Sequence, residues 1–422
     1  MKSISCITRG AHVLLWFILL AACTSEDTTV QQTEEIAEPA VQSTAIVYEG
    51  ATLITGDSLE TIESGVLVID NGLIVDVGSV DDIEIPAGAE RIDLSGSTIM
   101  PMMIDTHVHL STDPDGLRQD LENRAIFGVS AAMSLGMDGN DEVLDFQRQE
   151  IPGAARYFTA GKGITRPEPG RTEVPHWINT PEEARIAVQE EALRGVDIIK
   201  IWVDERGGQY EKMTPELYSA VIDEAHDYGI PVTAHIFSMS DAKGLLEAGI
   251  DSFAHGVRDM DIDDEFVAMI QARPNVVLVP NMPYRGVSTD YSWLEGFVEE
   301  EVLQRLQSQA ENPAAQESWG IQARNLNRLI EAGMTIAMGT DGNTPYAAHV
   351  EIEDMVAAGM TPMEAIVAAT STGAEFLGLD QAGSLEAGKS ADFIVLDANP
   401  LEDITNTRRI RDVYLRGERV NR

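Results

Sequence analysis

Cysteine is almost missing from this chain. Two of its 422 residues are cysteine, Cys6 and Cys23, and both lie within the first 23 positions. The rest of the sequence therefore excludes disulfides, thiolate zinc sites and a cysteine nucleophile. A metal ion bound there must use histidine, aspartate, glutamate or a modified lysine.

Positive charge is also scarce. Lys and Arg number 29 against 70 Asp and Glu, which gives a formal net charge of −41. A surface this acidic repels phosphates, so we expect no nucleic-acid partner. The apolar share of 44% is ordinary for a chain with a buried core and argues against disorder. A length of 422 residues fits one large α/β barrel or two to three smaller domains.

The N-terminus has the features of an export signal. Lys2 and Arg9 precede an apolar run over residues 10–22 that is too short to span a bilayer comfortably. The run ends in Leu-Ala-Ala-Cys, which is similar to a bacterial lipoprotein cleavage box. We therefore predict a lipoprotein signal peptide over 1–22 and lipidation of Cys23. An ordinary secretory signal with a chance cysteine is the alternative.

Residues 23–44 are acidic and have little apolar periodicity, which predicts a flexible, lipidated tether. The lack of Asp after Cys23 favours the outer membrane, facing the periplasm or the exterior. We therefore expect a protein of the bacterial cell envelope that meets the membrane only through a lipid anchor. The sequence predicts no oligomeric state.

The body divides into a split β-rich piece and a long β/α array. Residues 45–99 hold short alternating or β-branched runs, with Asn71-Gly72 as a hairpin signal, and the same texture returns in 383–422. Between them, over 100–382, strand-like runs alternate with amphipathic helices. We count eight such strands: MMIDTHVH, SAAMSLG, ARYFTAG, DIIKIWV, PVTAH, SFAHG, VVLVPN and TIAMGTD.

Eight β/α units in this length predict a (β/α)8 barrel, since such barrels usually need about 250 residues. An open doubly wound sheet is the alternative, but no glycine-rich phosphate fingerprint follows the first strand. Residues 292–330 are predicted to be an extra helical insert after the seventh strand.

Polar residues at the strand ends are the candidates for chemistry. His107 and His109 stand two apart on the first strand, so both side chains project from the same face. A pair of neutral imidazoles at that spacing is half of a metal site. A structural or surface pair of histidines is the alternative.

Lys200 interrupts the apolar run DIIKIW. A buried, charged lysine is costly unless it is paired or neutralised. A neutral amine can capture carbon dioxide, and the resulting carbamate can bridge two divalent metals. The alternative is a lysine whose charged end reaches solvent at the strand end.

His235 and His255 end two successive strands, and Asp341 ends the eighth. With His107, His109 and Lys200 they make six polar groups at the carboxyl ends of predicted strands. In a (β/α)8 barrel that face is the active face.

With these motifs the sequence resembles the amidohydrolase superfamily, in particular its imidazolonepropionase-like and Xaa-Pro dipeptidase-like metal hydrolases. The resemblance runs from about residue 45 to the C-terminus. It implies an α/β fold, a (β/α)8 TIM barrel over 100–382, with a small β-sandwich built from both chain ends over 45–99 and 383–422. Its most specific segments are PMMIDTHVHL, TPEEARIAVQEEALRGVDIIKIW, PVTAHIFSMSDAKGLLEAGIDSFAHG, IAMGTDGN and GSLEAGKSADFIVLDANP.

The resemblance also implies the role of each group. His107 and His109 would bind one metal, His235 and His255 a second, and carbamylated Lys200 would bridge them. Asp341 would bind the first metal and act as the proton shuttle. Two divalent ions, zinc by default with manganese or cobalt as options, would then activate hydroxide to cleave an amide C–N bond. The expected substrate is dipeptide-like or an N-acyl amino acid.

Substrate recognition is less specified by the motifs. His176, Arg258, Tyr284 and His349 are candidate substrate-binding residues, and Arg285 is a further one. Arg166, Arg171 and Arg258 are candidate receptors for a substrate carboxylate, although arginines in so acidic a chain mostly pair with neighbouring carboxylates.

Two alternative functions stay open. One is a deaminase or cyclic-amide hydrolase on the same fold. Two features argue against it: Ser238 occupies the position where deaminases of the superfamily carry glutamate, and Lys200 is present. The other is a catalytically silent, ligand-binding surface lipoprotein, which the intact set of six candidate ligands disfavours.

Overall fold

The computed structural model describes residues 43–171 and 173–422. The predicted signal peptide, Cys23 and all but the last two residues of the tether lie outside these ranges, and so do the predictions that rest on them. Within the two described ranges, no helix combines the length and the apolar character that crossing a membrane requires.

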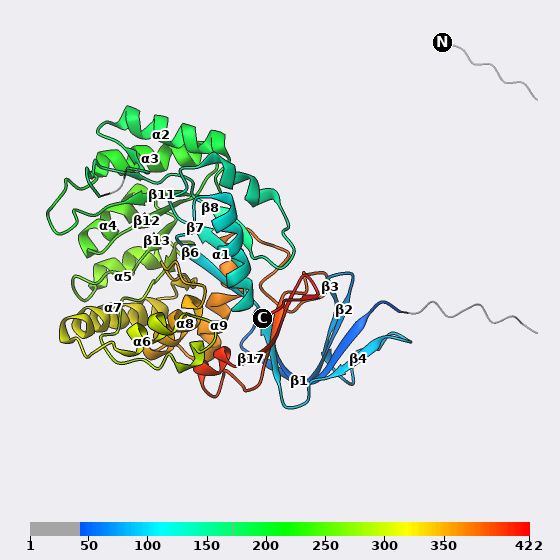
Figure 1. Cartoon of the computed structure of the whole chain (residues 1–422). Helices are drawn as coiled ribbons and strands as arrows, with labels where there is room; N and C mark the ends of the chain where they lie inside the picture. The colour runs from blue at the N-terminus through cyan, green and yellow to red at the C-terminus, as the bar shows by residue number, and fades with distance from the viewer. Residues whose placement is uncertain (1–42, 172) are drawn as a thin grey trace, which may run out of the picture. The chain divides into compact units, whose positions relative to one another are not determined.

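Both ends of the chain contribute strands to one sheet, coloured blue and red in Figure 1. Within the described residues this sheet has eight strands, in the order β18-β17-β16-β5-β1-β2-β3, with β4 on β1. The bounds are β1 (Ile46–Ile54), β2 (Thr61–Asp70), β3 (Leu73–Ser79), β4 (Glu90–Asp93), β5 (Thr98–Pro101), β16 (Phe393–Leu396), β17 (Ile410–Leu415) and β18 (Glu418–Arg419).

The sheet curves over its own apolar core. The Tyr48 ring on β1 lies 5.2 Å from that of Phe393 and 5.1 Å from that of Tyr414 on β17. Since β5 and β16 separate β1 from β17 in the sheet order, this contact requires a curved sheet. Hydrogen bonding thus joins the strands of both chain ends into one curved sheet, whereas a sandwich has two separate sheets. The predicted hairpin at Asn71-Gly72 joins β2 to β3, with φ of 51° and 79°.

Each of the eight predicted runs of the β/α part contains a strand. Neighbouring strands pair in parallel, first β6-β7-β8 and then β9-β11-β12-β13-β14-β15. The bounds are β6 (Met103–Val108), β7 (Val129–Ser134), β8 (Arg156–Thr159), β11 (Ile199–Trp202), β12 (Val232–His235), β13 (Ser252–Ala254), β14 (Val277–Val279) and β15 (Thr335–Ile336), with short β9 (Ile164–Thr165) and β10 (His176–Trp177).

Two backbone contacts join the parallel sets into a barrel-like ring. Thr106 N donates to Met338 O at 3.1 Å, which connects β6 to the segment after β15. Asp197 N donates to Thr159 O at 2.9 Å, which connects the start of the fourth strand to β8. The carboxyl ends of all these strands therefore meet on one rim.

Helices follow the strands and cover them from outside; α3, α4 and α5 lie side by side along β11–β13 in Figure 1. The predicted insert after the seventh strand contains η2, α6 and most of α7. The bounds are α1 (Pro114–Ile126), η1 (Asp141–Arg148), α2 (Pro181–Arg194), α3 (Pro215–Asp227), α4 (Met239–Ala248), α5 (Asp264–Gln271), η2 (Ser292–Leu294), α6 (Glu300–Gln307), α7 (Pro313–Glu331), α8 (Ala347–Ala357), α9 (Pro362–Ala369), α10 (Ser371–Phe376) and η3 (Ile404–Arg408).

Local sequence explains where these helices begin and end. Thr180 and Glu183 form a capping box at the start of α2, with proline at its first position. The helix ends at Gly195 in the left-handed conformation, φ 76°, which costs glycine little. The chain then enters β11, the strand that contains Lys200.

Candidate active site

Three of the predicted ligands converge closely on the rim. The ligand atoms of His107, His255 and Asp341 all lie within 4.8 Å of one another. Asp341 Oδ1 is 3.2 Å from His107 Nε2 and 2.9 Å from His109 Nε2, and Oδ2 is 3.6 Å from His255 Nε2. These residues follow or end β6, β13 and β15, so the parallel ring brings together side chains that are up to 234 positions apart.

The turn that carries Asp341 is fixed to β6. Asp341 has φ 52°, and its N–H donates to His107 O at 2.7 Å. Thr340 N donates to Asp105 Oδ1 at 3.0 Å. Arg124 contacts the other Asp105 oxygen at 3.4 Å and donates to Gly342 O at 3.2 Å. Burial raises the pKa of Asp105 to about 6, and the nearby Arg124 opposes that rise.

Lys200 and His235 lie beside this cluster. Lys200 is 1% exposed, and its Nζ has no hydrogen-bond partner among the described residues. Burial lowers the pKa of Lys200 to about 7, against the pull of Asp341. A large share of this amine is then neutral near neutral pH, the form that reacts with carbon dioxide. The His235 ring lies 4.6 Å from the His255 ring, and His235 Nε2 is 3.1 Å from Asp204 Oδ2.

Protonation states in the cluster suit a cation. Burial lowers the pKa of His107 to about 4 and that of His235 to about 3, and it holds the pKa of His255 well below its usual value. Burial alone would raise the pKa of Asp341, but His107, His109 and His255 together keep it well below its ordinary value. Neutral imidazoles around an ionised carboxylate are the donor set that divalent metals bind. The residues present therefore fit a metal centre.

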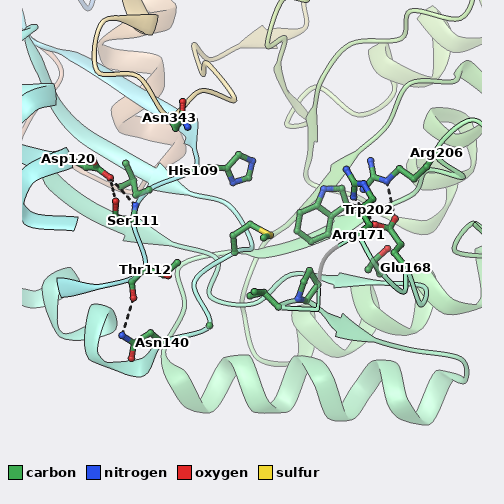
Figure 2. A pocket seen from close by; sticks show the side chains of 16 residues that line it. His109, Ser111, Thr112, Asp120, Asn140, Glu168, Arg171, Trp202, Arg206 and Asn343 are labelled. Carbon is green, nitrogen blue, oxygen red and sulfur yellow. Dashed lines mark hydrogen bonds and ion pairs between the residues drawn. The ribbon is translucent and has the colours of Figure 1, made fainter. Parts of the chain in front are cut away.

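A cavity of about 950 Å³ opens beside His109. Figure 2 shows His109 and Trp202 reaching into it from different walls. Glu168 forms ion pairs with Arg171 at 2.7 Å and with Arg206 at 2.9 Å along one side. The remaining lining is mixed polar and apolar and includes Leu110, Ser111, Thr112, Asp120, Met137, Asn140, Val174, Pro175 and Asn343. The cavity has room for a substrate larger than a few atoms next to the cluster.

Arg258 is an unusual cation in this acidic chain. Its guanidinium stacks on the Phe237 ring at 4.0 Å, and Phe237 in turn lies 4.5 Å from the His235 ring. Burial lowers the pKa of Arg258 to about 10. Its Nε is buried without a hydrogen-bond partner, and no carboxylate of the described residues forms an ion pair with it. The side chain is therefore a charged, partly desolvated donor beside the histidines.

The other candidate substrate residues are bound elsewhere. His349 is buried, with Nε2 2.9 Å from Phe127 O and Nδ1 3.2 Å from Thr407 Oγ1. His176 Nε2 contacts Glu191 at 2.7 Å, which draws the ring toward α2. Tyr284 donates to the carbonyls of Val287 and Ala310, at 3.2 Å each. None of the three lines the cavity beside His109, and a substrate role for them stays a prediction.

Three of the four candidate arginines are already paired with acidic residues. Arg285 forms ion pairs with Glu353 and Asp354, at 2.6 Å each. Arg166 donates to Ile178 O and Asn179 and pairs with Glu211. Arg171 lines the cavity but is already paired with Glu168. These three follow the expectation that arginines in an acidic chain find neighbouring acids, and Arg258 does not.

Two residues that hold the site in place, Asn281 and Asp105, were not predicted from the sequence. Asn281 Oδ1 accepts a hydrogen bond from His107 Nδ1 at 2.9 Å, and Asn281 follows β14 as the other site residues follow their strands. Asp105 shares the period of two with His107 and His109. Asp105 and Asn281 are both polar residues within predicted strand runs, MMIDTHVH and VVLVPN, and this position is the signal that could have identified them.

Comparison with known proteins agrees with this geometry. Residues 98–420 match the family described as the Amidohydrolase family. The ochratoxinase of Aspergillus niger is 27% identical over 422 aligned residues, covering 85% of this chain and 82% of the relative.

Two solved structures share both fold and sequence. A candidate prolidase from Bifidobacterium longum superimposes with a TM-score of 0.75 at 30% identity, covering 90% of this chain and 95% of the other. A Xaa-Pro dipeptidase with methionine bound in its active site gives a TM-score of 0.70 at 25% identity, covering 89% and 99%. With a family match over most of its length, this chain belongs to the amidohydrolase family and is a hydrolase that acts on C–N bonds.

Proposed function

We propose that this hydrolase cleaves the amide bond of a dipeptide-like or N-acyl amino acid substrate that has a free carboxylate on the leaving side. The observation that carries the proposal is Arg258, a half-buried arginine beside the histidines. Its Nε is buried without a hydrogen-bond partner, and its guanidinium has no ion-pair partner among the described residues. A carboxylate is the ligand that such a planar cation recognises best, because two parallel N–H groups of the guanidinium can bind its two oxygens.

The metal part of the proposal follows the donor set. His107, His109 and Asp341 would hold one divalent ion, and His235 and His255 a second, with carbamylated Lys200 between them. Zinc is the first choice, and manganese and cobalt suit the same ligands. When bound, such ions lower the pKa of a water molecule and polarise the scissile carbonyl.

Asp341 is the proposed proton carrier. Its carboxylate is ionised and faces His107, His109 and His255, so it accepts the proton that the attacking water loses. It then donates this proton to the leaving nitrogen as the C–N bond breaks. Without this transfer the amine would leave as an unstable anion.

The proposed substrate lies with its acyl part in the cavity and its carboxylate at Arg258. The loops that line the cavity follow β6, β7, β9, β11 and β15, whereas Arg258 follows β13. The two recognition elements therefore approach the histidines from different parts of the ring. A dipeptidase among the similar structures supports this substrate class. The envelope location stays a prediction from residues 1–44.

The test compares paired substrates that differ only at the carboxylate. Wild-type protein should hydrolyse N-acyl amino acids and dipeptides faster than their C-terminal amides, and a chelator should stop both reactions. Arg258→Met should remove the preference for the free acid, by about 10- to 150-fold in kcat/KM, because hydrogen bonds to charged groups contribute about 1.5–3 kcal/mol.

Arg171→Met is the matched control, because Arg171 lines the cavity but is paired with Glu168. It should leave the ratio between acid and amide unchanged. An undiminished preference in Arg258→Met would contradict the proposed carboxylate site, and activity that survives metal removal would contradict the metal mechanism. Hydrolysis of cyclic amides or release of ammonia alone would favour the alternative reactions on this fold.

A further inference from the structure

We infer that Asn281 is a positioning residue that fixes the tautomer and the direction of the His107 ring. The inference rests on the metal centre of the proposed function, and it concerns a residue with no direct part in that centre. It begins from two hydrogen bonds that one buried side chain makes, both to groups on the rim.

The orientation of the Asn281 amide follows from its partners. Its NH2 group lies 2.7 Å from Gly339 O, a carbonyl that can only accept. The amide oxygen is therefore the atom that faces His107 Nδ1, at 2.9 Å. An oxygen only accepts, so Nδ1 of His107 must carry the hydrogen. The lone pair of the neutral ring is then on Nε2, the atom that lies 3.2 Å from Asp341.

The backbone holds Asn281 in a position from which its side chain can make both hydrogen bonds. Asn281 is 3% exposed and has φ 42°, a left-handed conformation that asparagine adopts more readily than most residues. The neighbouring groups are held on both sides: Gln322 donates to Pro280 O at 2.6 Å, and Met282 N donates to Glu351 at 2.9 Å. The amide therefore has little freedom to turn away from His107.

Gly339 allows the close approach of the segments. A Cβ at Gly339 would lie 2.9 Å from His107 N and 2.6 Å from a Val279 methyl. The bare backbone lets the β15 segment lie against β6 and β14, with its carbonyl within reach of Asn281. A metal-binding imidazole whose other nitrogen is bonded in this way is fixed in direction, and loss of such a partner typically lowers metal affinity about 10- to 100-fold.

A purely structural role for Asn281 makes a different prediction. If the residue only ties β14 to the β15 segment, its replacement lowers stability and leaves the zinc affinity of the folded protein unchanged. It would also make aspartate as poor a replacement as any other residue, since an ionised carboxylate cannot donate to Gly339 O.

The experiment uses two variants and a binding readout. Asn281→Gly removes the amide and suits the left-handed backbone, so the variant is expected to fold. Asn281→Asp keeps an acceptor for His107 Nδ1. Zinc dissociation constants of the full chain are measured by competition with a chromophoric chelator, with folding checked by circular dichroism. We expect the glycine variant to bind zinc about 10- to 100-fold more weakly and the aspartate variant to retain most of the affinity.

Asn325→Gly is the matched control, because Asn325 is equally buried at 2% and bonds only backbone groups, at Val257, Met260 and Ile262. It should lower the melting temperature without changing zinc affinity. Unchanged zinc affinity in Asn281→Gly, or equal losses of zinc affinity in the glycine and aspartate variants, would overturn this inference and leave the proposed metal centre standing. Wild-type protein that binds none of zinc, manganese or cobalt would overturn the metal centre and this inference together.

Discussion

At the scale of single residues, burial decides the chemistry of the site. Lys200 is 1% exposed and lies against Trp202, with its Nζ 5.6 Å from the ring, and no acid forms an ion pair with it among the described residues. The same burial that lowers the pKa of Lys200 to about 7 makes the residue costly for the fold. A group that lowers stability in this way is expected where it serves a reaction.

Lys200→Met should separate these two effects. In metal-free protein the apolar side chain should raise the free energy of unfolding by about 1–3 kcal/mol, because it removes a polar group that lacks a hydrogen bond. The same variant should lose metal and lower kcat by more than the ~10–100-fold typical of a residue one contact further from the metal. Urea denaturation in chelator, metal analysis and turnover measure the three quantities.

Lys212→Met is the control for removing a lysine, since Lys212 is a partly exposed residue paired with Asp241 at 2.8 Å. It should keep both metal and turnover. If Lys200→Met turned over substrate at the wild-type rate, Lys200 would not be the bridge.

At the scale of elements, two glycines make room for the wall of the cavity. A Cβ at Gly163 would lie 2.0 Å from Trp202 Cζ3, and one at Gly136 would lie 2.5 Å from its Cη2. Gly136 follows β7 and Gly163 follows β8, and the Trp202 indole at the end of β11 packs directly against both glycines. Trp202 both covers Lys200 and lines the cavity, so its place determines how much space the substrate has.

Gly163→Ala should move the Trp202 ring into the cavity. This overpacking should lower the free energy of unfolding by about 1–3 kcal/mol. We expect kcat/KM for bulky acyl groups to fall relative to that for an acetyl group, which is measured across a series of N-acyl amino acids of increasing size. Gly320→Ala in α7 is the control, because a Cβ there meets its nearest neighbour at 3.5 Å. An unchanged ratio between large and small acyl groups would show that Trp202 does not limit the substrate.

At the scale of the whole molecule, His349 ties together parts that lie far apart in sequence. On α8 it bonds Phe127 O at the end of α1 and Thr407 in η3, and its ring lies 5.6 Å from that of Trp293 in the insert. Burial lowers the pKa of His349 to about 3. These contacts give His349 a structural role that involves four segments, and its substrate role stays a prediction.

The sign of the pH effect follows from that pKa. Below the unfolded value of 6.5, the unfolded chain binds a proton at His349 and the folded chain does not until pH is near 3. The stability that His349 contributes is therefore lost as pH falls from 6.5 toward 3, with a slope of about 1.4 kcal/mol per pH unit for one proton. His107 and His235 titrate in the same direction, so the wild-type slope includes them.

His349→Gln should remove one proton from this dependence. Urea denaturation in chelator between pH 7 and pH 4 gives the slope for each protein, and the variant's slope should be smaller by about 1.4 kcal/mol per pH unit. Parallel slopes for the two proteins would mean that His349 does not stay neutral in the folded state.

The sequence by itself determined the order of the strands and the residues at their ends. Apolar runs with period two or continuous hydrophobicity, separated by helical periodicity, depend on local burial and can be read along the chain. The six ligand candidates were identified for the same reason, since parallel strands place their carboxyl ends on one rim. The sequence also showed the Asn71-Gly72 hairpin, because two positive φ angles in a tight turn restrict the residue types.

Only the tertiary structure decided which polar side chains are already bonded to a partner. His349, His176 and Tyr284 have the same chemistry as the site residues, but the partners that bind them, such as Phe127 O and Glu191, come from other elements. Conversely, Arg258 stands out only because the acids near it, such as Asp341 and Asp204, form no ion pair with it. Asn281 stands out only because Gly339 O fixes the orientation of its amide. Hydrogen bonding depends on distance and direction in space, which spacing along the chain does not specify.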